Sequence, residues 1–266
     1  MTRELIVSFY GNEFFIGWIL FGWLFGVGTG SLIIKFLRRP FRGLPLLLSC
    51  HLLVALLVPL GIFWTRLFKS LFTNVAGQIP DLMPAMMASF LAVAPLCLVF
   101  GVQFTAASEY GKELHRKDGV GLLGMAYFYE ALGFVFGGLV FSYGLVFLNE
   151  FQTSAILIFL NLTAVFIFLS FEKVAERRYF FMAAIGVACL GLICFLCSER
   201  LNIRSVALRF PNEQLMETKN SIYGNLAVTR TANQFNFYES GLSVGTDKDE
   251  AFNECLVHFP MLSHTD

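Results

Sequence analysis

Six long apolar stretches, separated by short polar segments, fill the chain from its start to residue 198. Each can cross a bilayer, because about 20 apolar residues rising ~1.5 Å each cover a hydrocarbon core of ~30 Å. The pattern predicts spanning helices over 14–37, 44–65, 83–107, 121–147, 153–171 and 179–198. We therefore expect a mostly α fold, with a transmembrane helical bundle over residues 1–198.

The fourth stretch is organised around Glu130, which is followed by Gly133, Gly137 and Gly138. Residues four apart lie on one helix face, and glycines there let a second backbone approach closely. A carboxylate at membrane depth is costly unless it meets protein or trapped water. The sequence therefore predicts that Glu130 lies close to a contact between two helices.

Three further polar side chains fall inside the predicted spans, namely His51, Gln103 and Asn161. With Glu130 they form either a path for a solute or proton, or a set of hydrogen bonds between helices. Such bonds are worth roughly 0.6 kcal/mol each on average in membranes. We favour hydrogen bonding for Gln103 and Asn161, and leave both interpretations open for Glu130.

Beyond the last span the pattern changes to polar alternation, with a linker expected over 199–219. Asn225–Thr231 and Gln234–Glu239 alternate as the two arms of a β-hairpin, and Leu242–Thr246 adds a third short strand. The hairpin pattern places Leu226 and Val228 on the same face as Phe235 and Phe237.

A short amphipathic helix follows these strands. Thr246 or Asp247 is the expected N-cap, and Pro260 is the expected end. Its apolar positions are Phe252, Cys255 or Leu256, and Phe259. Residues 220–266 are thus predicted to form a small β-rich region with one helix.

Composition supports the membrane assignment. The chain is 56% hydrophobic and 14% charged, against about 25% charged in an average soluble domain. The zero net charge excludes a global field for nucleic acid, which we do not expect as a partner. The cysteines lie mostly in apolar runs and predict neither a disulfide framework nor a metal site.

Two motifs have a chemical and a structural interpretation. The run Gly26–Ser31, GVGTGS, resembles a nucleotide loop but lies inside a span without a preceding strand, so helix packing is favoured. Cys194 and Cys197 form a CxxC at the end of the sixth span, where small buried side chains are the favoured interpretation over a metal or redox pair.

Basic residues cluster after the first, third and fifth spans. The loops at 35–42, 112–117 and 173–178 are therefore expected to be cytoplasmic, in the inner (plasma) membrane of a bacterium. Alternation then places the tail on the opposite face. Arg200, Arg204 and Arg209 count against this placement, and the conflict stays open at the level of sequence.

Residues 220–264 resemble the β-rich N-terminal region of the spermidine synthase (aminopropyltransferase-like) family. The matching features are Tyr223-Gly224 opening a strand, the hairpin, the acidic patch Asp247–Glu250, and the run Glu254, His258 and Pro260. The stretches GNEFFIGWILFGWLFGVGTGS and YFYEALGFVFGGLVFS look like the multi-span region of membrane-fused members of that family.

The resemblance implies a polyamine role, in which an amine attacks the activated methylene of decarboxylated S-adenosylmethionine. The residues that match substrate-binding positions are Tyr223, Asp249, Glu250, Glu254 and His258. Asp249, Glu250, Glu254 and His258 also have a structural interpretation, since acidic residues favour a helix N-terminus and residues four apart share a helix face. No catalytic residue and no metal ligand is assigned.

The chain departs from the family pattern in two ways. The family's nucleotide-binding domain would begin where this sequence stops, at Thr265-Asp266, so we expect an incomplete copy without a cofactor pocket. Ser243-Val244 and Phe252-Asn253 stand where authentic synthases have Gln and Tyr-His, and they cannot donate the same hydrogen bonds. The chain alone is therefore not expected to transfer an aminopropyl group.

The expected partners are the lipid bilayer and either a downstream nucleotide-binding domain or further copies of this chain. Two other classes of function stay open. One is a transporter that moves a small solute or cation by means of Glu130. The other is a non-catalytic membrane scaffold.

Overall fold

The computed structural model describes residues 2–8, 13–36, 43–72, 76, 81–115, 119–172, 174, 176–221 and 224–263. The helices are α1 (Thr2–Ser8), α2 (Glu13–Ile33), α3 (Leu44–Phe72), α4 (Leu82–His115), α5 (Gly119–Tyr143), α6 (Glu150–Phe171), α7 (Arg177–Leu196), α8 (Ser198–Ala207) and α9 (Glu250–Ser263), with 3-10 turns η1 (Ile34–Phe36) and η3 (Leu145–Phe147). The strands are β1 (Gln214–Asn220), β2 (Asn225–Thr231), β3 (Gln234–Glu239) and β4 (Leu242–Thr246).

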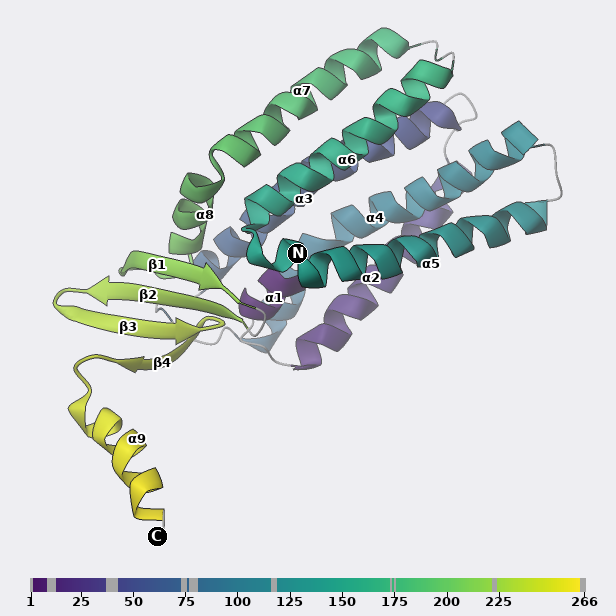
Figure 1. Cartoon of the computed structure of the whole chain (residues 1–266). Coiled ribbons are helices and arrows are strands. Elements are labelled where there is room, and N and C mark those ends of the chain that lie inside the picture. Colours follow the sequence, from purple (N-terminus) through teal and green to yellow (C-terminus); the bar gives the residue numbers. More distant parts are fainter. Residues whose placement is uncertain are drawn as a thin grey trace.

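Within the described residues, six helices, α2 to α7, are long and apolar enough to cross a membrane, which confirms the predicted spans. The chain is therefore an integral membrane protein. In the bundle α3 lies between α4 and α6, while α2 packs on α4 and α7 packs on α6 (Figure 1). The C-terminal sheet lies at one end of the bundle, and the C-terminal ends of α2, α4 and α6 lie at the other (Figure 1).

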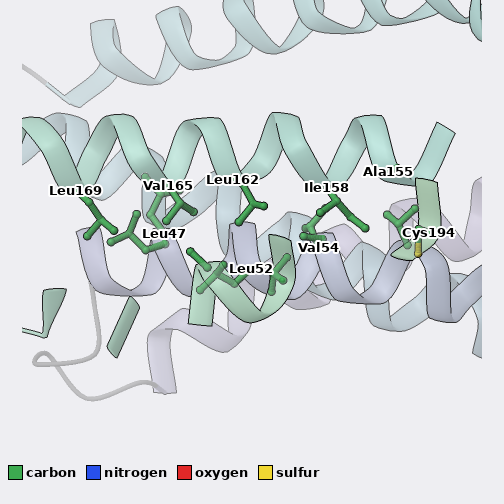
Figure 2. Close-up of a cluster of buried hydrophobic side chains, with 14 of the residues drawn as sticks. Leu47, Leu52, Val54, Ala155, Ile158, Leu162, Val165, Leu169 and Cys194 are labelled. Carbon is green, nitrogen blue, oxygen red and sulfur yellow. The ribbon is translucent and has the colours of Figure 1, made fainter. Parts of the chain in front are cut away.

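The larger core lies between α3, α6 and α7. Buried residues on α6 recur every three or four positions, at Ala155, Ile158, Leu162, Val165 and Leu169, and form one helix face. Figure 2 shows these side chains directed toward α3. Asn149 begins α6 with a capping box, in which its side chain accepts from the Gln152 backbone at 2.8 Å.

Glycines bring α2 and α4 into close contact. A Cβ at Gly30 would collide with the carbonyl oxygen of Leu98, and one at Gly101 with that of Val27. The helix-packing interpretation of the GVGTGS run is therefore confirmed.

The glycines of α5 behave differently. A Cβ built at Gly133, Gly137 or Gly138 meets nothing within 4 Å. The predicted close approach of another helix to this face is therefore wrong among the described residues of the chain. Small residues permit a close contact but do not create one, because the partner helix must also be placed there.

The C-terminal sheet is antiparallel with the order β1-β2-β3-β4. The predicted hairpin is confirmed, with Val228 opposite Phe237 and Arg230 opposite Phe235, so the apolar residues share the exposed face. The other face buries Ala227 and Tyr238 against Val206 and Phe210. The segment 199–219, expected to be a linker, contains most of α8 and β1, whose pairing with β2 extends the sheet.

The helix after the sheet, α9, begins two or three residues later than predicted. Asp249 caps it, because its Oδ1 accepts from the Phe252 backbone at 3.1 Å. The predicted cap at Thr246 or Asp247 is wrong: Asp247 instead accepts from the backbone of Phe235 at 2.8 Å. The helix also continues past Pro260, to Ser263, and leaves its large apolar side chains exposed.

Candidate functional site

Three of the four intramembrane polar residues line a cavity of about 530 Å³ formed by α2 to α6, and Asn161 does not. Glu130, His51 and Gln103, which come from three different spans, all line it. The rest of the lining is apolar and largely aromatic: Trp23, Val27, Leu47, Phe100, Phe104, Ala107, Gly133, Phe134 and Phe168.

His51 is held by amides from two other helices. Its Nδ1 lies 2.9 Å from Asn161 Oδ1, and Gln103 Nε2 lies 3.3 Å from both ring nitrogens. Asn161 Nδ2 donates to the Leu157 carbonyl at 2.9 Å, which leaves its oxygen directed toward the ring. A neutral imidazole protonated on Nδ1 satisfies this arrangement, with Nε2 as the acceptor for Gln103. The predicted interhelical bonding of Gln103 and Asn161 is therefore confirmed.

Glu130 lines the same cavity from α5. This helix is the least buried of the six spans, because few of its side chains are covered by the rest of the bundle. The contacts of α5 with its neighbours are partly aromatic, since the rings of Trp23 and Phe134 lie 6.0 Å apart and those of Phe104 and Tyr127 lie 4.8 Å apart. Tyr127 and Phe134 lie three and four positions from Glu130 on the same helix face, so Glu130 borders the cavity beside the contacts of α5 with α4 and α2. Its carboxylate and the surrounding ring faces both attract positive charge.

A second polar cluster lies where the bundle meets the sheet, and the sequence did not predict it. Arg66 Nε and Nη2 donate to the Glu4 carboxylate at 2.8 and 3.0 Å, and Nη2 also donates to Glu150 at 2.8 Å. Arg209 forms a further ion pair with Glu4. The side chains of Arg66 and Arg209 are only 1% and 2% exposed. We call Glu4, Arg66, Glu150 and Arg209 the junction cluster.

Neutral side chains tie the junction cluster to the C-terminal part of the chain. Arg66 Nη1 donates to Asn202 at 2.9 Å and to Ser205 at 2.6 Å, both on α8. Glu150 accepts from Asn220 of β1 at 3.0 Å. The cluster therefore joins α1, α3, α6, α8 and the sheet.

The charges within the cluster determine the protonation of Glu4. Burial by itself would raise the pKa of the Glu4 carboxyl, but the guanidiniums of Arg209 and Arg66 outweigh burial and hold that pKa well below its ordinary value. Glu4 is therefore ionised at neutral pH. With two carboxylates and two guanidiniums, the cluster is neutral as a whole.

The spacing of buried residues along α3 could have predicted that Arg66 is buried. Val58, Ile62 and Arg66 follow one another at four-residue spacing, and the first two are buried. Placing the end of the second span at residue 65 separated Arg66 from this face, whereas α3 continues to Phe72. Glu4, Glu150 and Arg209 have no comparable signal, because a single charge beside a span is typical of a solvated flank.

Four of the five substrate-binding positions suggested by the family resemblance lie at or along α9, which extends away from the helical bundle (Figure 1). Asp249, Glu250, Glu254 and His258 are exposed, at the start of α9 or along it, and Asp249 serves as the helix cap. Tyr223 lies outside the described residues. No group of three or more potential metal ligands is found among the residues that the structure describes.

Comparisons with known proteins provide no relative from which to transfer a function. No protein-family model matches the sequence, and searches of curated proteins and of solved structures find no match.

Proposed function

We propose that the helical domain binds a small organic cation in the cavity lined by Glu130 and carries it across the membrane. The observation that supports this proposal is the composition of the cavity wall: one carboxylate stands among Trp23, Phe100, Phe104, Phe134 and Phe168. Aromatic faces attract organic cations by about 0.5–2 kcal/mol per ring, and most strongly where water is excluded.

Other solute classes fit the cavity less well. An anion would meet the Glu130 carboxylate without a cationic side chain in the described lining to compensate. A bare metal ion prefers several oxygen or nitrogen ligands at once, and His51 already bonds two amides. The volume of about 530 Å³ lies within the range of small-molecule sites.

The family resemblance suggests the first compound to test. A polyamine carries ammonium groups separated by short alkyl segments, so that one ammonium can pair with Glu130 while the alkyl segments lie on the rings. Spermidine is therefore the proposed test ligand. The Gln103 amide and the His51 imidazole, which also line the cavity, add hydrogen-bonding groups to its wall.

We also propose that the loops 35–42, 112–117 and 173–178 are cytoplasmic. The junction cluster supports this orientation in part, because Arg66 and Arg209 are buried in ion pairs and add no free basic charge at the sheet end, whereas Arg200 and Arg204 stay exposed there and count against it. The sheet and α9 then lie on the outer face of the plasma membrane of a bacterium.

A second proposal retains the aminopropyl-transfer role that the resemblance implies. Its support is the solvent exposure of Glu250, Glu254 and His258 on α9, where a soluble amine can reach them. It requires the sheet on the cytoplasmic side and a nucleotide-binding domain to supply decarboxylated S-adenosylmethionine. We expect no binding of that cofactor to this chain by calorimetry, and micromolar binding would contradict this expectation.

Equilibrium binding of radiolabelled spermidine to the full chain in nanodiscs tests the principal proposal. Glu130→Gln should weaken binding about tenfold or more, because a charge-assisted hydrogen bond is worth about 1.5–3 kcal/mol. Phe134→Leu should weaken it severalfold by removing a ring face. Matched controls are Glu199→Gln and Phe171→Leu, whose side chains are exposed outside the cavity.

Equal binding by wild type and Glu130→Gln would refute the assignment of Glu130 as the counter-ion. Loss of binding in the controls as well would show that the measured sites are not in this cavity.

A further inference from the structure

A second cavity, of about 620 Å³, lies beside the junction cluster. Its wall comes from α1, α3, the end of α5 with η3, the first turns of α6, and three residues between strands of the sheet, Ser221, Gly224 and Ser240. It therefore lies where the membrane-spanning helices meet the sheet (Figure 1). It shares no lining residue with the cavity of Glu130.

One part of this wall is polar. Glu4 and Glu150 contribute carboxylates, and Ser221 and Ser240 contribute hydroxyls. Among the described residues, the charged groups that line the cavity are both carboxylates, while the guanidiniums that neutralise them do not line it. The carboxylate oxygens already accept hydrogen bonds from Arg66, Arg209 and Asn220, and the Ser221 hydroxyl accepts one from the Gly224 backbone. Since a carboxylate has about four lone-pair sites, the polar wall favours a ligand group that adds a further donor.

The remaining wall is apolar. Val58 and Ile62 of α3, Leu145 of η3 and Leu157 of α6 line the cavity here. Phe141, in the last turn of the α5 span, also lines the cavity and is 41% exposed, so the apolar wall reaches the surface that α5 presents to lipid.

We propose that this cavity binds an amphiphile with a primary ammonium group and an alkyl chain. The ammonium meets the carboxylates of Glu150 and Glu4 and the serine hydroxyls, and the alkyl chain lies among the side chains of α3, η3 and α6. The position of the cavity suits such a molecule, because the ends of spanning helices lie at the level of lipid headgroups. The ligand is either a membrane lipid with an ethanolamine headgroup or a free long-chain amine.

Native mass spectrometry of the full chain tests the proposal, after delipidation and re-addition of defined amphiphiles. One arm adds phosphatidylethanolamine or phosphatidylcholine, which differ in the N–H donors of the headgroup. The other adds dodecylamine or dodecyltrimethylammonium, which differ in the same way without a phosphate. We expect severalfold greater retention of the N–H-bearing member in at least one arm, and the arm identifies the source.

Variants of η3 assign the binding to this cavity. Leu145→Trp fills the apolar wall and should abolish the preference, whereas Phe147→Trp, in the same turn but 70% exposed and outside the lining, should preserve it. Equal retention of the paired amphiphiles in both arms, or an unchanged preference in folded Leu145→Trp, would overturn the proposal. Thermal melting of each variant establishes that it is folded.

Discussion

Replacing Arg66 with methionine removes a guanidinium that contacts Glu4 and Glu150 while keeping most of the side-chain volume. Glu4 retains Arg209 and Glu150 retains Asn220, but both carboxylates stay in a site that water barely reaches. We expect this single change to destabilise the junction between the bundle and the sheet.

The magnitude follows from the contacts. Arg66 is 1% exposed and donates five hydrogen bonds, three of them to carboxylates. Removing one partner of a buried ion pair costs about 3–5 kcal/mol, because the other charge is left uncompensated. For a chain of this size, that corresponds to a fall in melting temperature of roughly 6–20 °C.

Thermal unfolding in detergent, followed by tryptophan fluorescence, measures this effect. Arg204→Met is the matched control: its side chain is exposed on α8, and the expected change is within about 0.5 kcal/mol. Arg66→Lys should fall between wild type and Arg66→Met, because an ammonium keeps the charge but cannot reproduce the planar fork. Equal melting temperatures for Arg66→Met and Arg204→Met would refute the stabilising role of the junction cluster.

Three further predictions concern packing, pH and orientation. Gly101→Ala should lower the melting temperature, because the new Cβ collides with the backbone of α2, whereas Gly28→Ala, with nothing within 4 Å, should not. Because the pKa of Glu4 is lower in the folded chain than its ordinary value of about 4.3, the ionised carboxylate stabilises the fold at pH values above about 4.3. The free energy of unfolding should therefore fall as the pH drops below that value, and it should fall less in Glu4→Gln. In a cysteine-free background, a cysteine at Lys219 should be labelled from outside intact cells and one at Arg177 should not; the reverse pattern would invert the orientation.

The sequence was sufficient to predict the six spans and the hairpin. Both depend on local patterns, namely the length of an apolar run and the alternation between Asn225 and Glu239. The end of α3 was misplaced because a helix does not stop where its hydropathy falls, and Arg66 lies on the same face as the apolar residues before it. A period-based extension of the span would have included it.

Features that depend on tertiary placement were beyond the sequence. The same glycine signal predicted close packing on α2, where Gly30 meets α4, and on α5, where Gly133 faces a cavity. The junction cluster joins residues more than 200 positions apart, Glu4 and Arg209, and no local pattern connects them. The sequence identified Glu130, His51 and Gln103 one by one, but their common cavity depends on how α3, α4 and α5 pack.

Uptake of radiolabelled spermidine by proteoliposomes tests the transport proposal most directly. The full chain should accumulate spermidine above the level of protein-free liposomes, Glu130→Gln should reduce the initial rate to near that level, and Glu199→Gln should retain the wild-type rate. Uptake by Glu130→Gln at the wild-type rate, or wild-type uptake no greater than in empty liposomes, would contradict it.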